Sequence, residues 1–134
     1  SKTIKSPEIL TRYVRKSLGR GIIKKYLTSD NQLMIASLDR AVEDTIVMSQ
    51  QINDDGSTSL NLDPELAQRL LNSIAGTMRG FEPHGAIPIL LCGSRIRWDL
   101  KKLVTRFIPG LIILAFDELP AEAKTKSIGT VRLQ

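Results

Sequence analysis

The chain has 134 residues, a hydrophobic fraction of 42% and a formal net charge of +5. This length suits one ordinary domain, with or without a small appendage, that can bury a core without disulfides. The single cysteine, Cys92, excludes an internal disulfide and favours a reducing, cytosolic setting. Basic residues are mixed with acidic ones over the chain as a whole, so the charge admits acidic partners, including nucleic acid, without selecting one.

Membrane insertion is not expected from the sequence. No apolar run approaches the roughly 20 residues of a membrane span. The opening residues, Ser1 to Lys5, are not followed by the apolar core of a signal peptide. We therefore expect a soluble segment.

The first predicted element is a helix that begins at Ser6-Pro7-Glu8, where a hydroxyl, a proline and an acid are all typical of a helix start. Leu10, Val14 and Leu18 give it one apolar face. The remaining positions are rich in cations, which form either a solvated face or a partner contact: Arg12, Arg15, Lys16, Arg20, Lys24 and Lys25. A polar stretch over residues 28–32 predicts a boundary.

Two strands and a helix are predicted after this boundary. Residues 33–37 favour a strand, and Asp39 is placed to cap a helix over residues 40–50. Residues 52–57 have the composition of a turn or mobile loop. The alternation over residues 59–62 predicts a short edge strand.

A second helix is predicted from Asp63-Pro64 to Gly80, because a capping acid followed by proline is typical of a helix start. One apolar stripe runs along it: Leu66, Leu70, Leu71, Ile74, Ala75 and Met78. A loop over residues 82–85 then leads to the most apolar part of the chain.

The apolar part predicts a strand, a helix and a second strand. Residues 87–92 form a nearly continuous apolar run, typical of a strand buried on both faces, and Ser94 could cap the next helix. Pro109-Gly110 ends that helix, and residues 111–116 form a second buried run. The helix stripe consists of Ile96, Leu100, Leu103, Val104 and Phe107. A helix between two such strands makes a parallel crossover, so we predict an α/β fold. A last short strand is expected over residues 127–133.

Cys92 invites an enzymatic interpretation, because cysteine phosphatases place a thiolate in a loop between a strand and a helix. Their phosphate-binding arginine follows six positions later, where this chain has Trp98. A buried core thiol is the favoured interpretation. His84 has no cysteine or histidine cluster around it, so no metal is expected. Asp117-Glu118 could act at the end of a strand, but we interpret them as loop carboxylates.

Trp98 lies within a basic cluster on the predicted helix, with Arg95, Arg97, Lys101 and Lys102. Tryptophan and arginine carry much of the binding energy at protein interfaces, so this cluster is a candidate docking surface. The alternative is that Trp98 merely covers the edge of the sheet.

A set of short motifs follows in a fixed order along most of the chain. They are Leu10-Thr11, Tyr13-Val14-Arg15, Leu18-Gly19-Arg20, Pro88-Ile89-Leu90-Leu91, Ser94, Ile96-Arg97, Leu103, Phe107, Pro109, Leu111, Leu114, Phe116 and Glu118-Leu119-Pro120. This ordered set resembles the C-terminal part of the FlhA/InvA family, the export-gate proteins of bacterial type III secretion.

The resemblance implies a non-enzymatic module without cofactors, in which residues 1–30 end the third cytoplasmic subdomain and residues 31–134 form the α/β fourth. It implies a nine-membered ring at the cytoplasmic face of the bacterial inner membrane, held there by N-terminal segments. Copies of the chain, chaperone–cargo complexes and gatekeeper proteins are the expected partners, and nucleic acid is not.

Two residue sets follow from the resemblance combined with the basic clusters. Ring contacts are expected from Arg12, Arg15 and Arg20. Partner docking is expected from Arg95, Arg97, Trp98 and Lys101. An injectisome is favoured over a flagellum. The alternatives are a small anion-handling enzyme that uses the Cys92 loop, and a basic nucleic-acid-binding domain.

Overall fold

The structure is a computed structural model that describes residues 27, 32–121 and 123–133. The predicted N-terminal helix therefore lies outside the described residues. The described elements are β1 (Gln32–Leu38), α2 (Arg40–Ser49), β2 (Gln50–Ile52), β3 (Thr58–Leu60), α3 (Pro64–Met78), a 3-10 helix (Arg79–His84), β4 (Ile89–Cys92), α4 (Ser94–Thr105), β5 (Ile112–Ala115), a second 3-10 helix (Phe116–Glu118) and β6 (Lys124–Val131).

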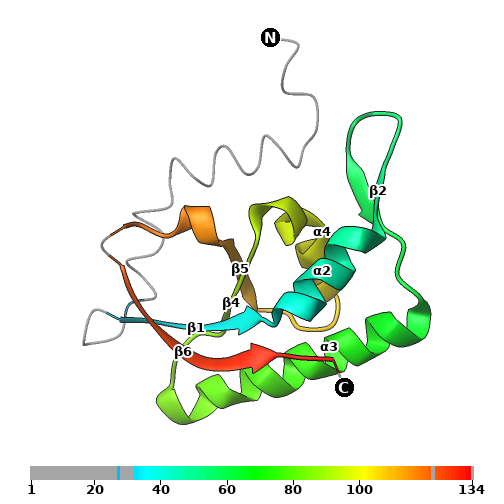
Figure 1. The fold of residues 1–134 in the computed structure, drawn as a ribbon. Coiled ribbons are helices and arrows are strands. Elements are labelled where there is room, and N and C mark those ends of the chain that lie inside the picture. Colours follow the sequence, from blue (N-terminus) through cyan, green and yellow to red (C-terminus); the bar gives the residue numbers. More distant parts are fainter. Residues whose placement is uncertain (1–26, 28–31, 122, 134) are drawn as a thin grey trace.

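The main sheet has four strands in the order β5-β4-β1-β6, and all its pairs are parallel (Figure 1). Helix α4 makes the crossover from β4 to β5, whose register pairs Leu90 with Ile113. The predicted α/β fold and its β-α-β core are confirmed. Strand β6 pairs with β1 and begins at Lys124, three residues before the predicted start at Ser127.

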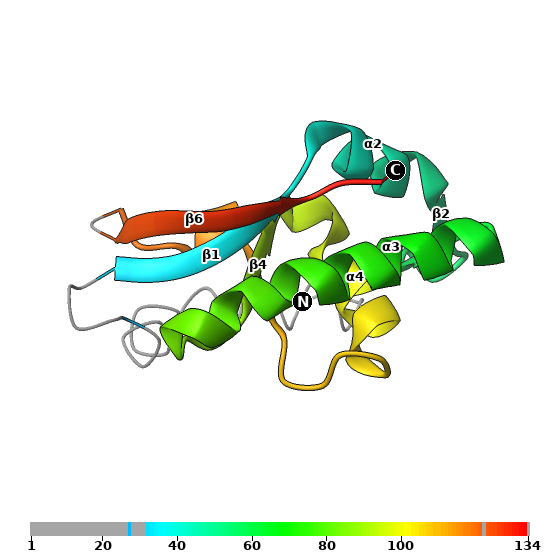
Figure 2. The same cartoon turned by 90° about the horizontal axis from the view of Figure 1, so that it is seen from below.

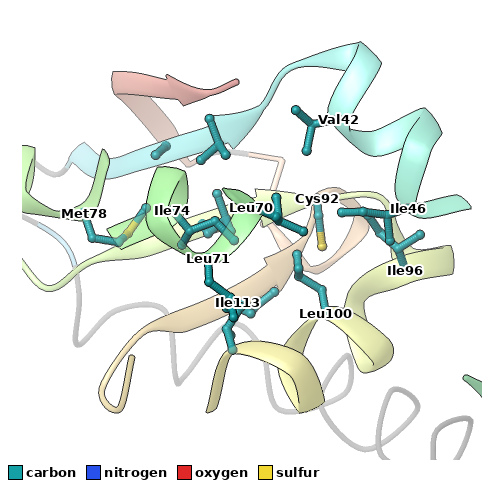
Figure 3. Close-up of a cluster of buried hydrophobic side chains, with 14 of the residues drawn as sticks. Val42, Ile46, Leu70, Leu71, Ile74, Met78, Cys92, Ile96, Leu100 and Ile113 are labelled. Atoms are coloured by element: carbon teal, nitrogen blue, oxygen red, sulfur yellow. The ribbon is translucent and has the colours of Figure 1, made fainter. Parts of the chain in front are cut away.

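The strands from these apolar runs are continuously apolar because both faces of the sheet are buried. All four residues of β4 are buried, and their side chains alternate between two clusters, as the period of a strand requires. Leu90 and Cys92 join the cluster beneath α2, α3 and α4 (Figure 3). Ile89 and Leu91 join a cluster on the other face.

Helix α3 lies across one face of the sheet (Figure 2), and its buried side chains belong to the same cluster as Leu90 and Cys92. It begins at Pro64, as predicted, and ends at Met78, before the predicted end at Gly80. A 3-10 helix follows and buries Phe81. Ile74 is fully buried, whereas Leu66 is only half-buried. Asp63 occupies the N-cap position without a side-chain capping hydrogen bond.

The cap of α4 differs from the prediction. Gly93, not Ser94, is the N-cap residue, and Ser94 is the first residue of the helix. The Gly93 N–H instead donates to the Oε1 atom of Glu43 in α2, at 3.0 Å. A Cβ atom at position 93 would lie 2.6 Å from Glu43 Oε2, so a larger residue here would displace the carboxylate.

Two aromatic residues predicted for the core lie at the surface. Phe107 is 60% exposed because α4 ends at Thr105, before the stripe reaches it. Phe116 is 53% exposed because it begins the 3-10 helix after β5.

The predicted short strand is present as β3, but it is not an edge of the main sheet. It pairs in antiparallel fashion with β2, so that Gln50 faces Leu60 and Ile52 faces Thr58. Strand β2 was not predicted, since its residues were assigned to the end of α2 and the following turn. The resulting hairpin projects beside α4 (Figure 1).

Candidate functional site

The candidate docking surface lies on the exposed side of α4. Arg95 and Lys101 are exposed, and Trp98 is half-buried. The Nζ atom of Lys102 lies 5.8 Å from the centroid of the Trp98 ring, within the range of a cation–π interaction. We call Arg95, Trp98, Lys101 and Lys102 the α4 surface. It combines three cations with one large aromatic side chain on a single helix.

The β2–β3 hairpin holds the α4 surface in place through Asp99, which is only 2% exposed. Asp99 Oδ2 accepts hydrogen bonds from the Thr58 hydroxyl and, at 3.0 Å, from the Gln50 amide. Asp99 Oδ1 lies 3.3 Å from Lys102 Nζ. Arg95 Nε donates to Gln50 Oε1 at 3.1 Å. The cations at both ends of the surface are therefore oriented by one buried carboxylate and its hairpin partners.

Arg97 does not belong to this surface, which corrects the prediction that it docks a partner. Its side chain is 2% exposed. Its Nε atom donates to the Ile113 carbonyl at 2.9 Å and lies 3.3 Å from Glu118 Oε1. The spacing could have revealed this, because Arg97 precedes Leu100 and Val104 by three and seven positions, on the buried side of α4.

Glu118 completes the buried pair. Its Oε1 atom also accepts the N–H of Ala115 at 2.9 Å, so the carboxylate links the end of β5 to the 3-10 helix and to α4. The neighbouring Asp117 is exposed. The interpretation of the two acids as loop carboxylates holds for Asp117, whereas Glu118 is part of the core.

Cys92 lies in the core, as its favoured interpretation stated. It is fully buried in the cluster between the sheet and the helices. Burial, together with the nearby Glu43 carboxylate, raises the pKa of the thiol to about 12. The thiol is therefore protonated at neutral pH, and the thiolate that a nucleophilic cysteine needs is not formed.

The remaining predicted sites are distributed as follows. His84 is exposed at the end of the first 3-10 helix. Among residues 27, 32–121 and 123–133, no three His, Cys, Asp or Glu side chains are placed to hold a metal ion. No helix in the same residues is long and apolar enough to cross a membrane. The predicted ring contacts Arg12, Arg15 and Arg20 lie outside the described residues.

Comparison with known proteins places this geometry in a family. The model of the FHIPEP family matches residues 1–124. The chain is 28% identical over 124 residues to the flagellar biosynthesis protein FlhA of Bacillus subtilis, covering 92% of this chain and 18% of that protein. It is 30% identical, with the same coverage, to the low calcium response locus protein D of Yersinia pestis. The chain thus spans under a fifth of the length of these relatives.

Solved structures share the fold. CdsV of Chlamydia pneumoniae matches with a TM-score of 0.84 and 25% identity, over 98% of this chain and 37% of that one. Nonameric EPEC SctV-C matches with a TM-score of 0.81 and 26% identity, over 96% and 38%. CdsV in complex with CdsO matches with a TM-score of 0.82 and 27% identity, over 98% and 38%. The chain belongs to the FHIPEP family, the family of the FlhA- and InvA-type export-gate proteins.

Proposed function

We propose that the chain is a non-enzymatic cytoplasmic module of a type III secretion export gate that assembles into a ring and docks proteins for export. The membership in the FHIPEP family carries this proposal, supported by a nonameric structural relative. A relative has also been solved together with a second protein, as the CdsV and CdsO complex. We favour an injectisome over a flagellum, with the module at the cytoplasmic face of the inner membrane.

In this proposal the two basic clusters have different roles. Residues 1–30 would end one subdomain and contribute ring contacts through Arg12, Arg15 and Arg20. Residues 31–134 would form the next subdomain and dock chaperone–cargo or gatekeeper complexes through Arg95, Trp98 and Lys101. The docking assignment rests on the α4 surface, where exposed cations flank a tryptophan on a helix fixed by the hairpin.

The rival functions receive less support. An anion-handling enzyme would need a reactive Cys92, and the raised pKa of that buried thiol disfavours it. Nucleic-acid binding would use the same cations, with Trp98 as the stacking side chain. A single aromatic residue on the α4 surface offers few of the stacking positions that such proteins combine.

Site-specific crosslinking in the bacterium that carries the parent gene tests the docking assignment. A photoreactive phenylalanine analogue replaces Trp98 or, separately, Lys101, and crosslinked proteins are identified by mass spectrometry. We expect secretion chaperones, cargo or gatekeeper proteins at both positions, because the α4 surface would lie in the interface.

The matched control places the same analogue at Asp44, whose side chain is 66% exposed on α2. Position 44 should give none of these products. Equal products from positions 44, 98 and 101 would contradict docking at the α4 surface, as would no product from either of the two test positions.

A further inference from the structure

A second polar surface lies between α3 and the outer strand β6, apart from the α4 surface. It is a groove of about 530 Å³. Of the described residues that line it, two are arginines and none is acidic. They are Arg69, Asn72, Ser73, Gly76 and Thr77 on α3, Thr130 in β6 and Arg132 just after β6. The groove therefore offers positive charge and hydrogen-bonding groups rather than apolar surface.

The strand beside the groove is an edge of the sheet. Among the described strands, β6 pairs only with β1. The Val131 carbonyl accepts the N–H of Asp39, so it points inward, toward the end of β1. Backbone groups of successive residues in a strand point to opposite sides, so those of Thr130 point outward. Just after the strand, the Arg132 carbonyl accepts the Ser73 hydroxyl of α3, at 2.6 Å.

The groove stays open because α3 has a glycine in its middle. A Cβ atom added at Gly76 would meet nothing within 4 Å, whereas one added at Gly129 of β6 would lie 3.1 Å from the Thr77 methyl group. Helix and strand therefore pack tightly at Thr77 and leave space beside Gly76. A helix-interior glycine is unfavourable relative to alanine, so this space has a cost in helix stability.

We propose that the groove binds an extended segment of a partner protein that carries carboxylate side chains. The segment would lie along the outer edge of β6, accept and donate backbone hydrogen bonds at Thr130, and pair its carboxylates with Arg69 and Arg132. Strand addition at a sheet edge supplies backbone bonds, and arginine binds carboxylates through paired N–H groups. The exposed side chains of Lys124 and Lys126 extend the positive charge along β6. This site is additional to the docking proposed for the α4 surface.

Selection from a displayed library of random twelve-residue peptides tests the proposal. The immobilised 134-residue chain is the target, and an Arg69→Gln/Arg132→Gln variant removes peptides that bind elsewhere. We expect the remaining peptides to be enriched in Asp and Glu. Their affinity should fall about tenfold or more in the double variant, because two charge-assisted contacts are lost.

A second variant, Gly76→Gln, tests the shape of the groove without changing its charge. Its side chain would fill the open space, so it should also weaken binding of the selected peptides, while the Arg95→Glu variant of the α4 surface should not. Amide signals of Ser73, Gly76 and Thr130 should shift on titration of a selected peptide into the labelled chain.

Several results would overturn the proposal. The first is that the selected peptides are not enriched in Asp and Glu. The second is that their affinities are the same for the chain and for both groove variants. The third is that the selection yields no peptide whose binding depends on Arg69 and Arg132. A single-stranded oligonucleotide that binds the groove more tightly than every selected peptide would also overturn it, in favour of a nucleic-acid site. Because the α4 surface is separate, none of these results bears on the proposed docking function.

Discussion

Replacement of Glu118 by alanine should lower the free energy of unfolding by about 3–5 kcal/mol, the usual cost of removing one partner of a buried ion pair. The substitution leaves the Arg97 guanidinium, 2% exposed, without its carboxylate 3.3 Å away. It also removes the acceptor of the Ala115 N–H. Urea unfolding followed by circular dichroism measures the loss.

The neighbouring acid provides the control. Asp117 is exposed, so Asp117→Ala should change the stability by no more than about 0.5 kcal/mol. The double variant Arg97→Met/Glu118→Leu should recover part of the stability lost in Glu118→Ala, because apolar side chains of similar volume remove the unpaired buried charge but not the loss of the acceptor of the Ala115 N–H. Equal effects of the two acid-to-alanine substitutions would show that the pair is not buried in solution.

A second large loss is expected for Leu100→Ala, about 2–5 kcal/mol, because the substitution leaves a cavity between α4 and the sheet. Leu100 is fully buried in the cluster that contains Cys92, Ile96 and Ile113 (Figure 3). The same urea titration measures this loss.

Leu103, on the same helix, is the matched control. It is only half-buried against the same cluster, so Leu103→Ala should cost clearly less than Leu100→Ala. Losses of the same size would mean that Leu100 and Leu103 are buried alike, contrary to the structure.

The parallel sheet could be predicted because the apolar runs that form its strands are continuous in the sequence. The apolar runs that become β4 and β5 are continuous, and a strand buried on both faces needs no alternation to be recognised. The start of α3 could be predicted from Asp63-Pro64, since the signal lies in adjacent residues. The predicted ends of the helices and strands were less accurate. The stripe of α4 was extended to Phe107, although the helix ends at Thr105.

The polar contacts of the site could not be predicted, because their partners are distant in the sequence. The basic cluster around Trp98 gave Arg95 and Arg97 the same expected role, yet one is exposed and the other buried. What separates them is the position of Ile113 and Glu118 beside α4, which the fold alone determines. Asp99 was overlooked for the same reason, since its partners Gln50 and Thr58 lie on the unpredicted hairpin.

The most direct test of the proposed docking function is the amount of substrate secreted by the parent bacterium when Arg95→Glu and Lys101→Glu are introduced together into the full-length gene. The control is Arg40→Glu with Arg79→Glu, which changes the charge equally at two exposed positions away from the α4 surface. If the α4 surface docks export complexes, secretion should fall several-fold in the first variant and stay normal in the control, with equal protein levels, because like charges across an interface oppose docking. Normal secretion in both variants would contradict the assignment of docking to this surface.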